Sequence, residues 1–522
     1  MTNYISGISI LGIPAEMYTY GTQFWMIIVS EGFVSLAMAY AYLPVFYKLQ
    51  ITSSYEYLNQ RFNQTVRLLG SILFLTKMLL YIPIVIYVPA LAFSQVTGIN
   101  LHLVTPVVCI VCIFYTTLGG LKAVVWTDTV QTIIMFGALI IVLFMGTSSA
   151  GGFSEVWSRN LAGGRIDFFN FDWDPTIRHS FWTVTIGNFF SWMASCSINQ
   201  AMVQRCLAMP SLHSARVTAA ILVVGIMVLV SMCCYIGLVI YAYYYKCDPV
   251  TRGAIHKSDQ LLPYFVMQIA QTMPGLPGLF VSGVFSAALS SMSTGLNSMT
   301  GVIFEDLIKP RIKKPLSESQ ASFLMKVIVV IIGSICVGLV FVVEKMGAAL
   351  IQASGSLSAI TAGPLLGIFS LGMFCPQANP QGALAGGLIS GSLITWISIG
   401  TQMKMAQGLI RFPQKPVSVE GCNANWVAEY LSLTLVPDST PKPVEPAFIL
   451  YRVSYMYYCG LGAVTAFTVG LLVSYLTGSN KNKKIHRDLI SPVVYRFIDD
   501  GASCQVNGTN DVCKKIELDT IT

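Results

Sequence analysis

Long runs of apolar residues, separated by short polar segments, dominate this sequence. Most runs exceed the roughly 20 apolar residues that a helix needs to cross the hydrocarbon core of a bilayer. Because the runs are continuous and do not alternate, they predict membrane-spanning helices and exclude the strands of an outer-membrane barrel. We predict eleven spans, at about 22–47, 66–97, 102–118, 122–148, 180–206, 214–245, 276–305, 320–345, 348–375, 380–402 and 449–477.

The first 20 residues contain a shorter apolar piece, Ile5 to Pro14, which Gly7 and Gly12 interrupt. It is too short to cross a bilayer alone, and its glycines and proline are typical of half of a broken helix. It has no basic n-region, so it is not a signal peptide.

Composition agrees with this interpretation. Hydrophobic residues make up 54% of the 522 residues and charged residues only 11%, and the mean hydropathy is +0.66. Such a chain cannot cover a soluble globular domain with polar groups, so we predict a polytopic membrane protein in a lipid bilayer. The net charge of +7 indicates basic cytoplasmic loops and not nucleic-acid binding.

Two basic clusters lie at 309–314 and 481–487, and an even number of predicted spans separates them, so both are on the same side of the membrane. The positive-inside rule assigns that side to the cytoplasm. We therefore expect a transmembrane domain over 1–477 and a polar, disordered cytoplasmic tail over 478–522.

This topology assigns Cys247 and Cys422 to loops outside the cell, where a disulfide is chemically permitted. The sequence does not determine the distance between them, so whether they are bridged stays open. The other cysteines lie mostly inside apolar runs, and we interpret them as core residues.

Polar residues inside spans indicate function, because each costs a few kcal/mol unless it is satisfied. Ala287, Ser290, Ser291, Thr294 and Ser298 recur at helical spacing and form one face of small side chains and hydroxyl oxygens. Such a face either packs against another helix or coordinates a hard cation together with carbonyls of a broken helix. The broken first segment favours the cation site.

Two charged residues, Glu31 and Lys77, also lie inside spans. They can pair with each other, or Lys77, on the same helix face as Tyr81, can face a central cavity and attract a substrate carboxylate. Trp192 and Trp182 are candidates to line that cavity, although a tryptophan at a span end is often an interface anchor.

Several longer motifs, read in order, resemble the sodium/solute symporter family, and in particular its branch of iodide, monocarboxylate and multivitamin transporters. The similarity extends from Ile5 to about Leu476 and includes the segments Val85–Gly98, Gly119–Asp128, Asn199–Arg205, Pro274–Phe280 and Glu305–Pro310. It implies the LeuT-type fold, in which ten core helices form two inverted five-helix repeats with extra peripheral helices.

The family usually has one further helix and the first half of core helix one ahead of the point where this sequence starts. The resemblance therefore implies an N-terminally truncated core, from either a misplaced start or a short isoform, and poor transport by this form.

The resemblance also implies a sodium site formed by the carbonyl groups of Thr2, Ile5 and Ala287 and the hydroxyls of Ser290 and Ser291.

Asp128 corresponds to an aspartate on the sodium exit path, although a locally capped carboxylate at a helix end is an alternative. A second sodium or substrate region would involve Ser6, Ser9 and Tyr81, with Lys77 and Glu31 nearby.

We therefore expect a multi-pass plasma-membrane symporter that uses Na⁺ as its coupling ion, needs no cofactor, and imports a monocarboxylate or vitamin acid by alternating access. An inorganic anion such as iodide is the alternative substrate. An ion channel is disfavoured because no filter segment or voltage-sensing helix is found, and an enzyme because HExxH, GxSxG and convergent titratable groups are missing from the sequence. The identity of the anion, the stoichiometry and the oligomeric state stay open.

Overall fold

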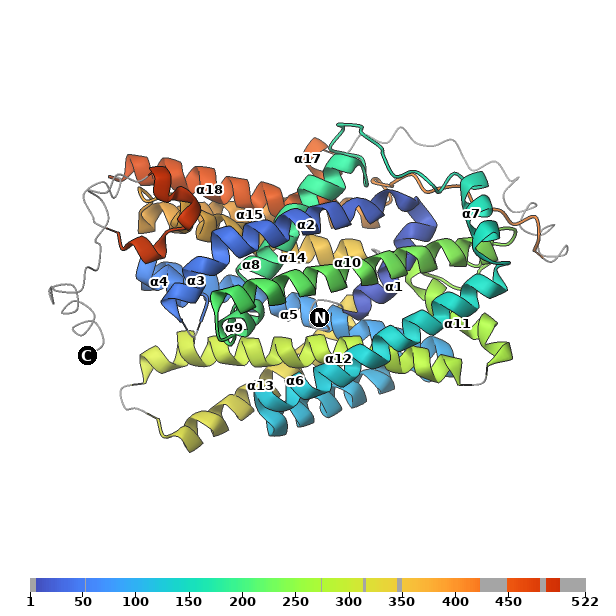
Figure 1. Ribbon diagram of the computed structural model, residues 1–522, viewed down its shortest axis with the longest axis horizontal. Coiled ribbons are helices and arrows are strands. Elements are labelled where there is room, and N and C mark those ends of the chain that lie inside the picture. The colour runs from blue at the N-terminus through green and yellow to red at the C-terminus, as the bar shows by residue number, and fades with distance from the viewer. Residues whose placement is uncertain are drawn as a thin grey trace.

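The structure, a computed structural model, describes residues 6–51, 53–273, 275–312, 316–344, 350–422, 448–478 and 485–497. All regular elements in these ranges are helical, which confirms the predicted all-α class. Most of the long helices run along the longest axis of the molecule (Figure 1).

The helices follow one another in a simple order along the chain. They are α1 (Gly7–Tyr20), η1 (Thr22–Met26), α2 (Ile27–Ala37), η2 (Met38–Tyr42), α3 (Leu43–Leu49), α4 (Glu56–Arg61), α5 (Gln64–Thr97), α6 (Leu101–Ser149), α7 (Phe153–Ala162), η3 (Thr183–Gly187), α8 (Asn188–Ser197), α9 (Gln200–Leu207), α10 (Leu212–Tyr243), η4 (Ser258–Gln260), α11 (Leu261–Ile269), η5 (Ala270–Thr272), α12 (Leu276–Val302), η6 (Ile303–Ile308), η7 (Lys309–Arg311), α13 (Glu318–Glu344), α14 (Leu350–Phe374), α15 (Pro380–Ala406), α17 (Ile449–Arg452), η8 (Tyr455–Tyr457), α18 (Tyr458–Leu476), η10 (Arg487–Leu489) and η11 (Pro492–Phe497).

Asparagine side chains begin several of these helices. Asn63, Asn100 and Asn379 each accept a hydrogen bond from a backbone N–H two or three residues later, at 2.8 to 3.0 Å. Asparagine is a preferred N-cap because its side chain satisfies a backbone donor that the helix leaves free. Gly98, with φ of +73°, ends α5 in the left-handed conformation that glycine adopts without strain.

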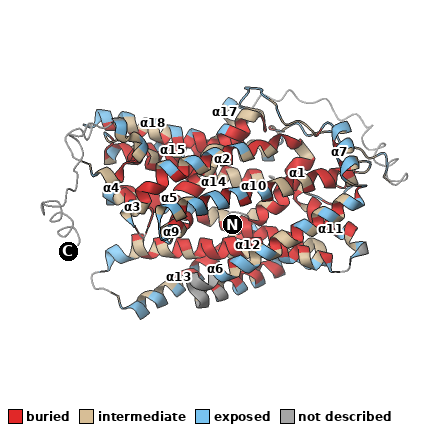
Figure 2. Ribbon diagram, in the orientation of Figure 1, coloured by how far each residue is buried: buried red, intermediate tan, exposed pale blue. Residues whose placement is uncertain are grey.

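Nine helices in the described ranges are long and apolar enough to cross a membrane. The first is continuous over Thr22–Leu49, although π and 3-10 turns interrupt its α-helical geometry. Large apolar side chains point away from the molecule: Phe114, Phe144 and Phe323 are each 65 to 70% exposed. In Figure 2, exposed residues alternate with buried ones along the outer helices. Exposed apolar side chains on such helices suit contact with lipid.

The backbone of α6 is helical over 49 residues, which would be about 74 Å long if the helix were straight. However, the Cys112 sulfur lies 3.9 Å from the Leu289 carbonyl oxygen of α12, and Asp128 accepts a hydrogen bond from the adjacent Ser290. Residues 16 positions apart on one straight helix would be about 24 Å apart. The chain therefore turns back, and the two parts correspond to the predicted spans 102–118 and 122–148.

The predicted span 180–206 is not one helix. It consists of η3, α8 and α9, and the helix is interrupted at Ile198 and Asn199. Asn199 has an extended backbone (φ −67°, ψ 129°), and its side chain accepts a hydrogen bond from Ala201 N at 3.0 Å. The break arises because the asparagine caps a new helix where apolar periodicity alone suggests continuation.

Part of the tail is ordered, contrary to the expected disorder. Within 485–497, Ser491 N donates to the Met373 carbonyl at 3.0 Å and its hydroxyl donates to the Ala41 carbonyl at 2.7 Å. Leu489 is also buried against the helices. Burial of these few residues holds the segment in place, whereas residues 498–522 lie outside the described ranges.

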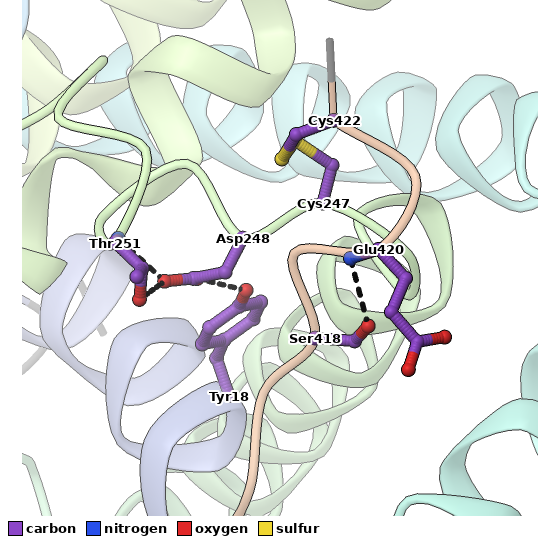
Figure 3. Close-up of a disulfide and its surroundings, with 7 residues drawn as sticks. All are labelled: Tyr18, Cys247, Asp248, Thr251, Ser418, Glu420 and Cys422. Atoms are coloured by element: carbon purple, nitrogen blue, oxygen red, sulfur yellow. Dashed lines mark hydrogen bonds between the residues drawn. A yellow bond between two sulfur atoms is a disulfide. The ribbon is translucent and has the colours of Figure 1, made fainter. Parts of the chain in front are cut away.

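The opposite end of the molecule carries α7, α11 and a disulfide between Cys247 and Cys422, which answers the question that the sequence left open. Figure 3 shows the bridge beside Asp248, whose carboxylate accepts hydrogen bonds from Tyr18 and Thr251. We call this the disulfide end, and the end that carries residues 485–497 the tail end.

Candidate functional site

The predicted hydroxyl face of α12 lies in the interior of the molecule. All five of its residues are buried, with side chains directed toward neighbouring helices. They are Ala287, Ser290, Ser291, Thr294 and Ser298. A buried face of this kind can hold a small cation, provided that its oxygen atoms are not all used by other partners.

Asp128 contacts this face. Ser290 Oγ donates a hydrogen bond to Asp128 Oδ1, and Arg205 of α9 donates to Asp128 Oδ2 at 3.0 Å. The same Arg205 nitrogen also donates to Thr294 Oγ1 at 3.2 Å. The carboxylate is therefore held from two helices and not capped locally, and α6, α9 and α12 meet at this point.

The hydroxyl of Ser291 is different, because it has no hydrogen-bond partner among the described residues although it is buried. A buried oxygen without a protein partner is available to a water molecule, a ligand or an ion. Of the other residues in the predicted sodium site, Ala287 is fully buried on the same face. Thr2 and Ile5 lie outside the described residues.

Close packing brings the start of α1 to this region. A β-carbon on Gly7 would lie 2.9 Å from Val88 Cγ1 of α5 and 3.7 Å from Val284 Cγ1 of α12. A larger residue at this position would force Val88 to shift, so glycine favours this approach of α1 to α5. Val284 precedes Ala287 by one turn, so α1 begins beside the hydroxyl face.

A cavity of about 210 Å³ opens against the hydroxyl face. Lys77 and Tyr81 of α5 line it together with Ser291 and Thr294. Residues from both sides of the break between α8 and α9, including Asn199, also line it. We call this the Lys77 cavity.

A second cavity of about 200 Å³ lies beside the first, and its wall contains Ser6, which precedes α1, and Ser9 of α1. We call it the Ser6 cavity. The two cavities share the lining residues Tyr81, Ser191, Trp192, Ser354 and Gly355. The structure thus brings together Ser6, Ser9, Tyr81 and Lys77. Trp182 is not among these lining residues and stacks on Trp173 with 3.8 Å between the ring centroids.

Lys77 and Glu31 do not form the ion pair that we considered. Among the described residues, no carboxylate lies within ion-pair distance of Lys77. Glu31 is 2% exposed, and neither of its carboxylate oxygens has a hydrogen-bond partner there. The two charges are on different helices, and of the two residues only Lys77 lines the cavity described above.

Sequence reasoning missed Arg205 and the cavity-lining Asn199. Both belong to the recognised segment Asn199–Arg205, but a position in a motif does not reveal which partner a side chain meets. The helix break could have been predicted from Asn199, because an asparagine inside an apolar run favours an N-cap position over a helix interior.

The chain matches the profile of the Sodium:solute symporter family over residues 1–390. It is 38% identical over 496 residues to sodium-coupled monocarboxylate transporter 2 of Mus musculus, with 95% of this chain and 79% of that protein covered. It is 39% identical to sodium-coupled monocarboxylate transporter 1 of Mus musculus, covering 94% of this chain and 81% of the relative. It is 38% identical to the sodium-dependent multivitamin transporter of Oryctolagus cuniculus, with 95% of this chain and 78% of that protein covered.

Among solved structures, the chain resembles a Na⁺-coupled sialic acid symporter in a substrate-bound, outward-open state. The TM-score is 0.70 at 23% identity, and the match covers 91% of this chain and 88% of the other. This likeness confirms the predicted LeuT-type fold. Together with the profile and the curated relatives, it shows that the chain is a multi-pass, sodium-coupled membrane transporter, not an enzyme, and that it belongs to the sodium:solute symporter family.

Proposed function

We propose that this symporter imports a small organic monocarboxylate together with Na⁺. The observation that carries the proposal is Lys77, a cation without a carboxylate partner among the described residues, in the wall of a cavity beside the hydroxyl face of α12. A lysine at membrane depth needs a negative partner, and a substrate carboxylate would provide one. The relatives named above, which transport monocarboxylates and vitamins, support an organic acid.

Cavity size favours a short acid. Each of the two central cavities, at about 200 Å³, is smaller than the roughly 300 Å³ at which pockets for drug-sized ligands begin. A short monocarboxylate would fit the Lys77 cavity alone, whereas a vitamin acid would have to extend into the Ser6 cavity. Tyr81 and Trp192 border both cavities and would contact the apolar part of either ligand.

For sodium, we propose coordination by the hydroxyls of Ser290 and Ser291 and by the carbonyl groups of Ala287, Thr2 and Ile5. The unpartnered Ser291 hydroxyl supports this assignment. Asp128, hydrogen-bonded to Ser290, would then receive the ion on its way to the tail end. Ser6, Ser9 and Tyr81 remain the proposed second sodium or substrate region.

We further propose that the disulfide end faces the outside of the plasma membrane and the tail end the cytoplasm. The bridge between Cys247 and Cys422 supports this orientation, because disulfides persist in oxidising compartments. Sodium arriving from outside would stabilise the form that is open at the disulfide end, and substrate would bind to that form. By linkage, sodium and substrate each raise the affinity for the other by the same factor.

The test is uptake of a panel of radiolabelled anions by cells that express the chain, with sodium or choline in the medium. We expect sodium-dependent uptake of short monocarboxylates, weaker uptake of biotin- or pantothenate-like acids, and little iodide uptake. Preferential uptake of iodide or of neutral sugars would contradict the proposed substrate.

The role of Lys77 is tested with Lys77→Gln, which should raise the carboxylate concentration for half-maximal uptake about tenfold at normal surface abundance. Lys326→Gln, at an exposed site on α13, is the matched control. If the double variant Lys77→Gln with Glu31→Gln recovers the parent affinity for substrate, the lysine does not bind substrate.

A further inference from the structure

Arg178 is a charged residue buried at the disulfide end. It lies in the segment before α8, and its side chain is 4% exposed. Its Nε atom donates to Glu16 Oε1 of α1 at 2.6 Å, and its Nη1 atom donates to Gln352 Oε1 of α14. A buried charge needs a close partner of opposite sign, and Glu16 provides it.

Aromatic rings enclose the same guanidinium group. The rings of Tyr20, Phe412 and Tyr455 lie with their centroids 4.4, 5.2 and 5.2 Å from the guanidinium carbon. Contacts of this kind are favourable for an arginine and stronger where water is excluded. The cluster thus joins α1, the segment before α8, the loop after α15 and η8.

The cluster separates two cavities. A third cavity, of about 380 Å³ and lined by polar residues that include Glu16 and Gln352, lies on one side, and we call it the Glu16 cavity. On the other side is the Ser6 cavity, which Tyr455 borders. The two share no lining residue, and along α1 the lining changes within one turn, between Ile13 and Glu16.

The helices around the cluster form two tightly packed groups. A β-carbon on Gly237 of α10 would lie 2.7 Å from the Pro14 carbonyl oxygen of α1. Likewise, a β-carbon on Gly363 of α14 would lie 2.7 Å from the Cys459 carbonyl oxygen of α18. Backbones this close leave no room for sliding side chains. We therefore treat α1 with α10 as the first group and α14 with α18 as the second.

Arg178 is anchored to the second group. The hydroxyl of Ser454, just before η8 and α18, donates to the Arg178 carbonyl at 2.8 Å, and Ser454 N donates to the Pro175 carbonyl at 2.9 Å. Glu16 belongs to the first group. The Glu16–Arg178 ion pair is therefore a contact between the two groups, at the level where the cavities are separated.

The loop after α15 covers this contact from the disulfide end. Lys415 N donates to the Thr19 carbonyl of α1 at 2.9 Å, and Asp248 N donates to the Ser418 carbonyl at 3.0 Å. Figure 3 shows how the bridge between Cys247 and Cys422 holds this loop beside Asp248 and Tyr18. The loop is thus fastened to the first group, and Phe412 extends from it to Arg178.

We propose that Arg178 is the gating residue at the disulfide end, and that its ion pair with Glu16 must separate each time substrate passes from the Glu16 cavity to the Ser6 cavity. The inference rests on the proposed orientation and on alternating access, but not on the identity of the anion. Separation moves the α1–α10 group away from the α14–α18 group and opens a polar path between the cavities.

The primary variant is Glu16→Gln, which keeps the shape and one hydrogen-bond acceptor but removes the charge that attracts Arg178. If the single variant folds poorly, the double variant Glu16→Gln with Arg178→Gln replaces it in the measurement, because it leaves neither charge of the pair without its partner. Glu155→Gln is the matched control, because Glu155 pairs with Arg159 at 2.8 Å on the surface of α7 at the same end.

The gate is measured directly with Ser354→Cys, which places a thiol in the wall of both central cavities. A membrane-impermeant thiol reagent is applied to intact cells. The labelling of surface protein that keeps Ser354 is subtracted, because it reports only the native cysteines. We expect Glu16→Gln to raise the labelling rate about tenfold, because a larger fraction of molecules is open, and Glu155→Gln to leave it unchanged.

Sodium dependence provides a second readout. If the gate opens more readily, the sodium concentration for half-maximal uptake should fall, because sodium binds the open form better. A purely structural ion pair would lower surface abundance and change neither readout in the molecules that remain. Unchanged labelling in both the single and the double variant would overturn the gating role, even if sodium-coupled uptake itself is demonstrated.

Discussion

Two arginine–carboxylate pairs lie at opposite sides of the central cavities and differ in their surroundings. Toward the disulfide end, Arg178 and Glu16 are 4% and 3% exposed and 2.6 Å apart. Toward the tail end, Arg205 and Asp128 are 30% and 10% exposed and 3.0 Å apart. The first pair is closed in by aromatic rings, whereas the second shares its carboxylate with a serine of the proposed sodium site.

This difference in exposure suits the two arginine–carboxylate pairs to different roles. A fully buried pair is costly to leave half-formed, so it favours two discrete states, joined or separated. A partly exposed pair gains little from its charge and exchanges partners readily. We therefore expect the Arg178 pair to control access at one end and the Arg205 pair to let Asp128 respond to an ion beside Ser290.

The largest effect is expected from removing one member of the buried pair. Arg178→Ala leaves the Glu16 carboxylate without its partner and should cost about 3–5 kcal/mol, enough to deplete surface protein. Surface biotinylation and thermal unfolding in detergent measure this loss. The double variant with Glu16→Gln should recover most of the abundance, and a stable Arg178→Ala protein would contradict the importance of the pair.

Next in size is the proposed sodium site beside the second pair. Changing Ser290 and Ser291 together to alanine should raise the sodium concentration for half-maximal uptake at least about tenfold, equivalent to about 1.4 kcal/mol. Ser282→Ala, on the exposed face of the same helix, is the control. An unchanged sodium dependence in the double variant would show that sodium binds elsewhere.

A smaller effect follows from His179, which adjoins the buried pair and has its Nε2 atom 3.3 Å from Glu16 Oε1. Burial, together with the charge of Arg178, holds the pKa of His179 well below its usual value near 6.5. As the pH falls, the His179 imidazole therefore becomes protonated in the unfolded chain before it does in the folded protein. Stability should therefore fall as the pH drops below about 6.5, by about 1 kcal/mol between pH 6.5 and 5.5.

Thermal unfolding across that pH range measures the effect of His179. His179→Phe should flatten the dependence, whereas His256→Gln, at an exposed position, should preserve it. An equal slope in the parent and in His179→Phe would exclude this histidine as its source.

The smallest effect on stability is expected at the partly exposed pair. Arg205→Gln should cost less than about 1 kcal/mol, since the Arg205 side chain is 30% exposed and the buried Asp128 keeps its hydrogen bond from Ser290. Its sodium dependence should change by a few-fold at nearly normal surface abundance. If Arg205→Gln depletes the protein as severely as Arg178→Ala, the contrast between the two pairs is wrong.

Local patterns in the sequence were sufficient for the class of protein and for much of the helix framework. Apolar runs indicate membrane helices because bilayer thickness imposes a minimum length, and periodicity alone places Ser290 and Ser291 on one face of α12. In the same way, the spacing of Lys77 and Tyr81 places both on one side of α5, where they line one cavity. These features depend only on neighbours within a few turns.

Contacts between distant segments were decided by the tertiary structure. Arg178 meets Glu16 across 162 positions of sequence, Cys247 meets Cys422 across 175, and Arg205 reaches Asp128 across 77. The same holds for Glu31 and Lys77, for which the sequence allowed a pair that helix packing does not form. Periodicity specifies which face of a helix is polar but not which helix lies opposite, because that depends on how close-packed glycines and broken helices arrange the whole bundle.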